Sequence, residues 1–191
     1  MVLPLFLLLG CKNKIDELFP PPPLVQLPPE TQSGANTFGC ILNDQVWEAS
    51  SHGSIRPFVF PSPDASYTRG TLILGAGQRT EGTSPLGSFR IYMGGVKQPG
   101  TYVLSKPPVR SAANYGYAEI SGSNPAIIYK TDSTHVGVIT ITQLDTAGAR
   151  PFIAGRFVLL ARPARGTAIP AGFPAEANAT QGRFDVQLNR P

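Results

Sequence analysis

The chain contains 191 residues, of which 41% are hydrophobic, so it is long enough for one medium-sized domain with its own core. Glycine and proline occur 20 times each and only 15% of the residues are charged, which argues against a coiled coil, a helical bundle or a charge-driven disordered chain. The 16 basic and 12 acidic residues leave a net charge of +4, a mild excess that is spread thinly along the chain.

An apolar run, VLPLFLLLG, occupies residues 2–10, and Cys11 follows at once. The run is too short to cross the ~30 Å hydrocarbon core of a bilayer, but it matches the apolar region of a secretory signal. Its end, residues 8–11, resembles the lipobox of bacterial lipoproteins, where the signal is cleaved before a cysteine that then carries lipid. We therefore predict a signal peptide over residues 1–10 and lipidation of Cys11, including palmitate. An apolar terminus that is neither cleaved nor lipidated is the alternative.

A proline-rich segment follows this cysteine, since six of the ten residues from 20 to 29 are proline. Such a segment favours an extended polyproline conformation of about 3.1 Å per residue and forms neither a helix nor a central strand. We predict that residues 11–35 are a lipidated tether and that residues 36–191 form a single domain. A proline-motif ligand for a partner domain is the alternative for the tether.

From residue 36 onward the sequence has strand signals and almost no helical periodicity. The first two strands form a hairpin, because Asn43 and Asp44 tolerate the left-handed conformations of a two-residue turn. About nine or ten short strands with Gly, Pro and Asn between them predict an all-β antiparallel sandwich, or a jelly-roll-like fold, with little helix. The predicted strands are 37–42, 45–49, 67–76, 86–93, 100–104, 115–121, 126–131, 136–144, 152–161 and 182–188.

Alternation within two of these strands predicts which side chains point into the core. Ile139 and Ile141 share one face, and Phe184, Val186 and Leu188 share another. The longest segments between strands, 50–66 and 162–178, are proline-bearing loops, and the second is expected to cover one end of the sandwich.

Cys40 lies in the apolar run at residues 37–42, where a buried, inert thiol is the expected role. A catalytic thiol would need a nearby base, and the chain has only His52 and His135.

Aromatic residues give two alternatives for function. Trp47, the only tryptophan, is expected to anchor the core, although it could also be a platform for a sugar ring. Tyr115 and Tyr117 share a strand face and could line a glycan groove, together with Tyr92, Tyr102 and Tyr129 on other strands. Half-buried tyrosines are also ordinary on a sheet surface.

Three stretches carry a resemblance to a known family. Residues 27–47 read LPPETQSGANTFGCILNDQVW, residues 137–145 read GVITITQLD, and residues 182–186 read GRFDV. These stretches resemble a family of small, uncharacterised lipoproteins of the Bacteroidota, over most of residues 27–188. The resemblance implies an exported, mostly β domain of unknown function, with no catalytic residues to carry over.

The sequence contains no Gly-x-Ser-x-Gly, His-Glu-x-x-His, Walker or EF-hand motif. Gly75-Ala76-Gly77 is the nearest approach to a nucleotide loop, but it lacks a third glycine and a following helix, so we interpret it as a tight turn. Two histidines and one spare cysteine are too few for a closed four-ligand site unless carboxylates contribute. We predict no catalytic residue, no metal and no cofactor.

Weaker alternatives remain open. Asp132, Ser133 and His135 are the residue types of a hydrolase triad, but triad members meet across a fold and not along one strand edge. A glycosidase needs two carboxylates that converge, and Asp44, Glu48, Glu119 and Asp145 are the candidates.

Four arginines lie within 16 residues without an acid among them: Arg150, Arg156, Arg162 and Arg165. Solvated arginines on an outer sheet face are ordinary, and export removes the chain from most nucleic acid. We predict no nucleic-acid partner; an anionic envelope surface is the more sensible electrostatic partner.

Asp132-Ser133-Thr134 and Asp145-Thr146-Ala147 resemble the pattern on which exported proteins of this bacterial group carry O-glycans. Both stretches lie at predicted turns, where a glycan would least disturb a sheet. Ser133 and Thr146 are therefore candidate O-glycosylation sites, with chance matches in a Ser/Thr-rich chain as the alternative.

Together these features predict a non-enzymatic cell-envelope lipoprotein at the bacterial outer membrane, on its periplasmic or surface face. Its partners would be the membrane, through the lipid anchor, and a glycan or an envelope protein. The alternative is a small carbohydrate-active or other hydrolytic enzyme on the same β-sandwich, because fold alone does not decide function.

Overall fold

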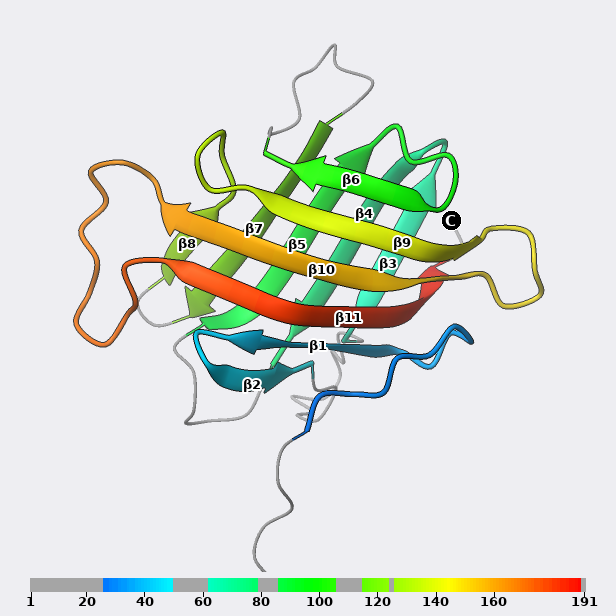
Figure 1. The fold of residues 1–191 in the computed structure, drawn as a ribbon, viewed down its shortest axis with the longest axis horizontal. Coiled ribbons are helices and arrows are strands. Elements are labelled where there is room, and N and C mark those ends of the chain that lie inside the picture. The colour runs from blue at the N-terminus through cyan, green and yellow to red at the C-terminus, as the bar shows by residue number, and fades with distance from the viewer. Residues whose placement is uncertain (1–25, 50–61, 79–85, 106–114, 124–125, 190–191) are drawn as a thin grey trace, which may run out of the picture.

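The computed structural model describes residues 26–49, 62–78, 86–105, 115–123 and 126–189, and Figure 1 shows their fold. These residues form eleven strands and no helix, so the predicted all-β fold is confirmed. No helix that could span a membrane occurs in the described part of the chain. The strands are β1 (Thr37–Leu42), β2 (Gln45–Glu48), β3 (Asp64–Thr68), β4 (Thr71–Gly77), β5 (Leu86–Gly94), β6 (Gly100–Leu104), β7 (Tyr115–Ser123), β8 (Ala126–Lys130), β9 (Gly137–Asp145), β10 (Phe152–Pro163) and β11 (Ala177–Asn189).

The strands are arranged in two layers. In Figure 1 the front layer consists of β2, β1, β11, β10, β9 and β6, and the strands of the back layer, β3, β4, β5, β7 and β8, run across it. Strands β10 and β11 reach both layers, because Leu188 of β11 pairs with Ala65 of β3, and Arg162 of β10 pairs with Lys130 of β8. A single, mostly antiparallel sheet therefore folds over on itself into a β-sandwich-like structure.

One core fills the space between the layers, because alternate residues of each strand point inward. Ile139 and Ile141 of β9 are buried, and so are Phe184, Val186 and Leu188 of β11. The faces that alternation predicted are confirmed.

Aromatic side chains form the centre of this core. The Trp47 ring lies edge-on to Phe38 and Phe89, with ring centroids 5.9 and 4.6 Å apart, and Phe157 stacks on Phe38 at 4.9 Å. The indole N–H donates a hydrogen bond to the Leu86 carbonyl over 3.0 Å. Each aromatic pair contributes about 0.5–1.5 kcal/mol beyond the area that it buries. Trp47 is 1% exposed and therefore takes the expected core role, with no ring face open to a ligand.

The first hairpin turns at Asn43 and Asp44, whose φ angles are 47° and 64°, as the turn chemistry predicted. Asn43 also ties this hairpin to β11. Its backbone N–H donates to the Asn178 carbonyl over 2.9 Å, and its side-chain oxygen accepts from the Asn178 N–H over 2.7 Å.

The largest differences from the predicted strands lie at the β3–β4 turn and at the loop between β10 and β11. Residues 67–76, expected as one strand, are divided between β3 and β4 by a turn at Arg69 and Gly70, whose φ angles are 50° and 84°. Arginine seldom adopts a positive φ, so this turn could not be predicted from its residue types. Strands β10 and β11 are also longer than predicted, which shortens the loop between them to 164–176. Most of the other predicted loop, residues 50–61, lies outside the described residues.

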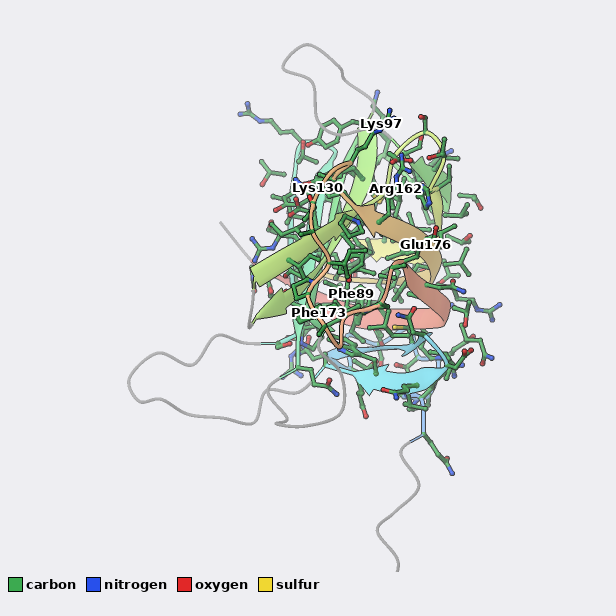
Figure 2. All side chains as sticks on the ribbon, turned by 90° about the vertical axis from the view of Figure 1, so that its left-hand side faces the viewer. Phe89, Lys97, Lys130, Arg162, Phe173 and Glu176 are labelled. Carbon is green, nitrogen blue, oxygen red and sulfur yellow. The ribbon has the colours of Figure 1, made fainter. Side chains whose placement is uncertain are left out.

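The loop over 164–176 covers one end of the core, as predicted. Phe173 packs against the core, and the Tyr129 hydroxyl donates to the Pro174 carbonyl over 2.6 Å. Figure 2 looks onto this end of the molecule, where the loop passes across the ends of the strands.

Residues 28–35 lie on the outer face of the front layer, and we call them the strap. Arg183 of β11 donates to the Pro28 carbonyl over 3.2 Å, and the Gln187 side chain donates to the Gly34 carbonyl over 2.8 Å. The sequence placed these residues in the tether, but the structure packs them on the domain.

Asp185, between these two β11 residues, holds the middle of the strap. Its carboxylate accepts hydrogen bonds from the Thr31 hydroxyl over 2.7 Å and from the backbone N–H groups of Ser33, Gly34 and Ala35 over 2.9, 2.7 and 3.1 Å. The side chain is fully covered by these contacts, with 1% of Asp185 exposed. Charged hydrogen bonds of this kind are the strong ones, so the strap is part of the folded domain.

Candidate functional site

A groove runs over β4 on the outer face of the back layer, and we call it the β4 groove. Its volume is about 390 Å³. The floor is backbone without side chains, because Gly75 and Gly77 are the outward-facing residues of β4 at this point. The polar walls come from the β3 side and from β5, and the residues that line the groove include Ser62, Asp64, Gly75, Gly77, Ser88 and Arg90.

Asp64 leans into the groove over Gly75. A Cβ atom on Gly75 would lie 2.5 Å from Asp64 Oδ1, so a larger residue would push this carboxylate aside. A glycine inside a strand often marks such a close approach. Within the described residues no hydrogen bond or ion pair reaches the Asp64 carboxylate.

Arg90 lies on the opposite wall. Gly75 pairs with Asp64 on one side and with Arg90 on the other, so the two charged residues are two strands apart. At about 4.8 Å between neighbouring strands, their Cα atoms lie roughly 10 Å apart. No ion pair joins the two side chains, and the groove therefore presents opposite charges that face each other across an open floor.

Two tyrosines stand in the next row of the same face. The rings of Tyr92 and Tyr117 stack with their centroids 5.2 Å apart and an angle of 18° between their planes. Lys130 Nζ lies 5.7 Å from the centre of the Tyr117 ring. Tyr117 is 8% exposed because these neighbours cover it, whereas Tyr92 is only half-buried and is the tyrosine nearer to β4.

Hydrogen bonds fix the charges beside Tyr117. Its hydroxyl donates to the Glu119 carboxylate, which also forms an ion pair with Lys130 Nζ over 2.9 Å. Burial, and then the bond to Glu119, raise the pKa of Tyr117, so the phenol stays neutral. Burial alone would raise the pKa of Glu119, but hydrogen bonds from Tyr117 and Lys130 and the charges of Lys130 and Arg90 hold it below its ordinary value.

The tyrosines named from the sequence do not share one site. Tyr117 belongs to the stacked pair beside the β4 groove. Tyr115 instead lines a separate cavity of about 560 Å³ between β6 and the ends of β5 and β7, together with Tyr102. Tyr129 is fully buried in the core.

Both candidate O-glycosylation sites lie in exposed turns. Ser133 and Thr146 are exposed, and the aspartate before each one accepts backbone N–H groups of its own turn. Asp132 accepts from Thr134 over 2.7 Å, and Asp145 accepts from Ala147 over 3.0 Å. These turns leave the hydroxyls accessible, and their glycosylation stays a prediction.

The catalytic alternatives find little support in the described residues. Cys40 is fully buried, and burial raises the pKa of its thiol to about 12, so it is not a nucleophile at neutral pH. The hydroxyl that contacts His135 Nδ1, at 2.9 Å, belongs to Thr134 and not to Ser133. His52 lies outside the described residues.

The four candidate carboxylates for a glycosidase lie on separate elements. Asp44 is in the β1–β2 turn, Glu48 ends β2, Glu119 is bound to Lys130, and Asp145 holds its own turn. No contact joins any two of them. Nor do the described residues include a group of three or more His, Cys, Asp or Glu side chains that could hold a metal ion.

No family model, curated protein or solved structure matches the chain. The candidate site therefore rests on its own geometry.

Sequence reasoning missed the residues that make the β4 groove. Gly75-Ala76-Gly77, interpreted as a tight turn, is part of β4. Two glycines at alternate strand positions leave one face of the strand bare, and this spacing is the signal that could have found the groove. Asp64 and Arg90 carried no such signal, because only the register of β3, β4 and β5 brings them to the same glycine.

Proposed function

We propose that the protein is a non-enzymatic, lipid-anchored binding module of the bacterial cell envelope, and that its β4 groove binds a saccharide. The observation that carries the proposal is that Asp64 and Arg90, neither of which forms a hydrogen bond or ion pair with a described residue, face a bare floor beside a partly open aromatic ring. Asp64 and Arg90 supply an acceptor and donors for sugar hydroxyls, and Tyr92 supplies a ring for the apolar face of a sugar.

The dimensions of the groove are consistent with a short saccharide. Outward residues two positions apart on one strand are about 6.8 Å apart. Tyr92 and Arg90 on β5 have this spacing and can therefore contact neighbouring sugar units of one saccharide. The bare floor lets a flat ring approach the backbone of β4 closely. Among the described residues that line the groove, Asp64 is the only carboxylate, whereas a glycosidase requires two.

The proposed anchor fits the position of the strap. Cys11 lies 15 residues before Gln26, the first described residue, and six prolines lie in residues 20–29. The strap joins this segment to the front layer, while the β4 groove opens on the back layer. A domain anchored through Cys11 would keep the groove on a different layer from the attachment of its tether.

Calorimetric titration of the full chain in detergent with a series of oligosaccharides tests the proposed function. Tyr92→Ala is expected to weaken binding of any saccharide ligand about tenfold, since the loss of an aromatic platform costs about 1–3 kcal/mol for a stacked base and we expect a similar loss for the apolar face of a sugar. The matched control is Tyr115→Ala, which removes a tyrosine from the other cavity and should leave affinity unchanged. Absence of binding to every saccharide, or equal losses in both variants, would overturn the proposal.

A further inference from the structure

We infer that the β4 groove selects a sugar that carries both a positive and a negative charge, such as an amino sugar with an acidic substituent. This inference rests on the saccharide-binding function proposed above and specifies its ligand. The ammonium group would bind Asp64, and the carboxylate or phosphate would bind Arg90.

The first argument is that the two charges of the groove do not neutralise each other. Opposite charges on neighbouring strands commonly form cross-strand pairs, as Glu119 and Lys130 do on the same face at 2.9 Å. Asp64 and Arg90 are held apart by the width of one strand, Gly75 lies between them, and no ion pair joins them. Glu119 is opposite Arg90 on β7, but its carboxylate forms its ion pair with Lys130 and none with Arg90. A ligand with two opposite charges could satisfy both residues at once.

The second argument concerns the chemistry of each wall. A guanidinium group presents a planar fork of N–H donors that matches a carboxylate or phosphate with two parallel hydrogen bonds. A carboxylate accepts hydrogen bonds from an ammonium group but repels the anion of an acid. The two walls therefore bind opposite ends of a dipolar ligand. Each wall repels a ligand that carries only the charge of that wall.

The third argument is that the glycine floor fits this arrangement. The Asp64 carboxylate occupies the space in which a Cβ atom of Gly75 would stand, at 2.5 Å from Oδ1. Gly75 has no positive φ angle, so backbone conformation does not require a glycine there. What the glycine provides is room for a carboxylate that bonds to no described residue.

The test titrates the full chain in detergent with four single sugars that are chosen for their different charges. Muramic acid has an ammonium and a carboxylate group, glucosamine has only the ammonium, glucuronic acid has only the carboxylate, and glucose has neither. Muramic acid is expected to bind at least tenfold more tightly than each of the others, and its advantage should shrink as salt rises.

Two isosteric variants assign the charges to their walls. Asp64→Asn should remove the advantage of muramic acid over glucuronic acid, and Arg90→Gln should remove its advantage over glucosamine. The matched controls change a charge on exposed turns away from the groove: Asp44→Asn for the first variant and Lys97→Gln for the second. Both controls should bind muramic acid as the parent does.

The outcomes separate this inference from the proposed function. If glucose binds as tightly as muramic acid and Tyr92→Ala abolishes both, the saccharide function stands and the charge selection is wrong. If β-alanine, a dipolar molecule without a sugar ring, binds as tightly as muramic acid, the sugar is not what the groove selects. If no sugar binds at all, both proposals are wrong.

Discussion

The two outer faces of this sandwich each carry an aspartate on a strand, and only one of the two is bonded to the described part of the chain. Asp185 on the front layer is 1% exposed and accepts four hydrogen bonds of 3.1 Å or less from the strap. Asp64 on the back layer bonds to no described residue, although it too lies against backbone, at Gly75.

This difference separates a structural carboxylate from one that is available to a ligand. A charge that is taken out of water needs its partners within the protein, and Asp185 finds them in a segment about 150 residues away along the chain. The Asp64 carboxylate lies at the wall of the β4 groove, where water or a ligand can supply the partners. Among the described residues, the strap covers the front face at Asp185, and no segment covers the back face at Asp64.

Neutralising each aspartate in turn should produce the largest difference between the two faces. Asp185→Asn should lower the free energy of unfolding by about 3 kcal/mol, because it removes charged hydrogen bonds and turns an NH₂ group toward N–H donors. Asp64→Asn should change it by less than about 0.5 kcal/mol, because the half-buried Asp64 carboxylate bonds to no described residue. Chemical denaturation of both variants measures the two effects. Equal losses in the free energy of unfolding would mean that the two aspartates contribute equally to stability.

The pH dependence of stability should follow the same division. Burial alone would raise the pKa of Asp185, but hydrogen bonds from Ser33, Thr31, Ala35 and Gly34 outweigh it and hold the pKa below its ordinary value. A carboxyl with a lowered folded pKa stabilises fully above its unfolded pKa of about 3.9, and this stabilisation is lost as the pH falls through the folded value.

The parent should therefore lose more stability than Asp185→Asn between about pH 5 and pH 2, when both are compared by denaturant titration. Asp132→Asn is the control, because hydrogen bonds, first of all from the Thr134 hydroxyl, lower the pKa of Asp132 as well. Solvent screens the Asp132 carboxylate, so Asp132→Asn should reduce the dependence of stability on pH less than Asp185→Asn does. If the stability of the parent and of Asp185→Asn falls equally with pH, the bonds between Asp185 and the strap do not contribute to stability against acid.

A glycine substitution tests the open face with little effect on stability. In Gly75→Ala the new Cβ would displace the Asp64 carboxylate, whereas in Gly77→Ala the nearest atom is Ser62 Oγ at 3.8 Å, an ordinary contact. Both variants should unfold within about 1 kcal/mol of the parent. Gly75→Ala should lose affinity for the muramic acid probe as Asp64→Asn does, and Gly77→Ala should retain it. If both glycine variants bind muramic acid as tightly as the parent does, the position of the Asp64 carboxylate does not affect binding.

Local patterning predicted the fold well because the core needs only alternation and turn chemistry. Ile139 and Ile141, the Asn43-Asp44 turn and the core role of Trp47 all follow from residues close together in the sequence. The strap could not be predicted in this way. Its residues look like the rest of a proline-rich tether, and Asp185 reads as an outward polar residue on a strand until the fold brings the two together.

The β4 groove could not be predicted either, because its residues are also brought together only by the fold. Asp64, Gly75 and Arg90 are ordinary residues on three strands, and only their register places them side by side. The aromatic signal was partly informative, since Tyr117 does lie beside the groove. It also pointed to Tyr115, which lines another cavity, and to Trp47, which is in the core.

The two cysteines extend the comparison to the segment that precedes the strap. Cys11→Ser should release the protein from the membrane fraction and leave the free energy of unfolding unchanged, because Cys11 lies 17 residues before Pro28, where the strap begins. A lipoprotein is retained by two or three acyl chains at about 0.8 kcal/mol per buried CH₂, so the loss of the lipid-bearing thiol should convert firm retention into free solubility.

Cys40→Ser is the matched control, since the same substitution at a fully buried position should have the reverse effects. It should leave the protein in the membrane fraction and lower the free energy of unfolding by about 1–2 kcal/mol, because a hydroxyl replaces a thiol in an apolar strand. Both variants are expressed with residues 1–10 intact, fractionated, and unfolded by denaturant in detergent. A Cys11→Ser protein that stays with the membrane would contradict the lipid anchor. One that leaves the membrane but unfolds more easily than the parent would mean that the segment before the strap also contributes to the fold.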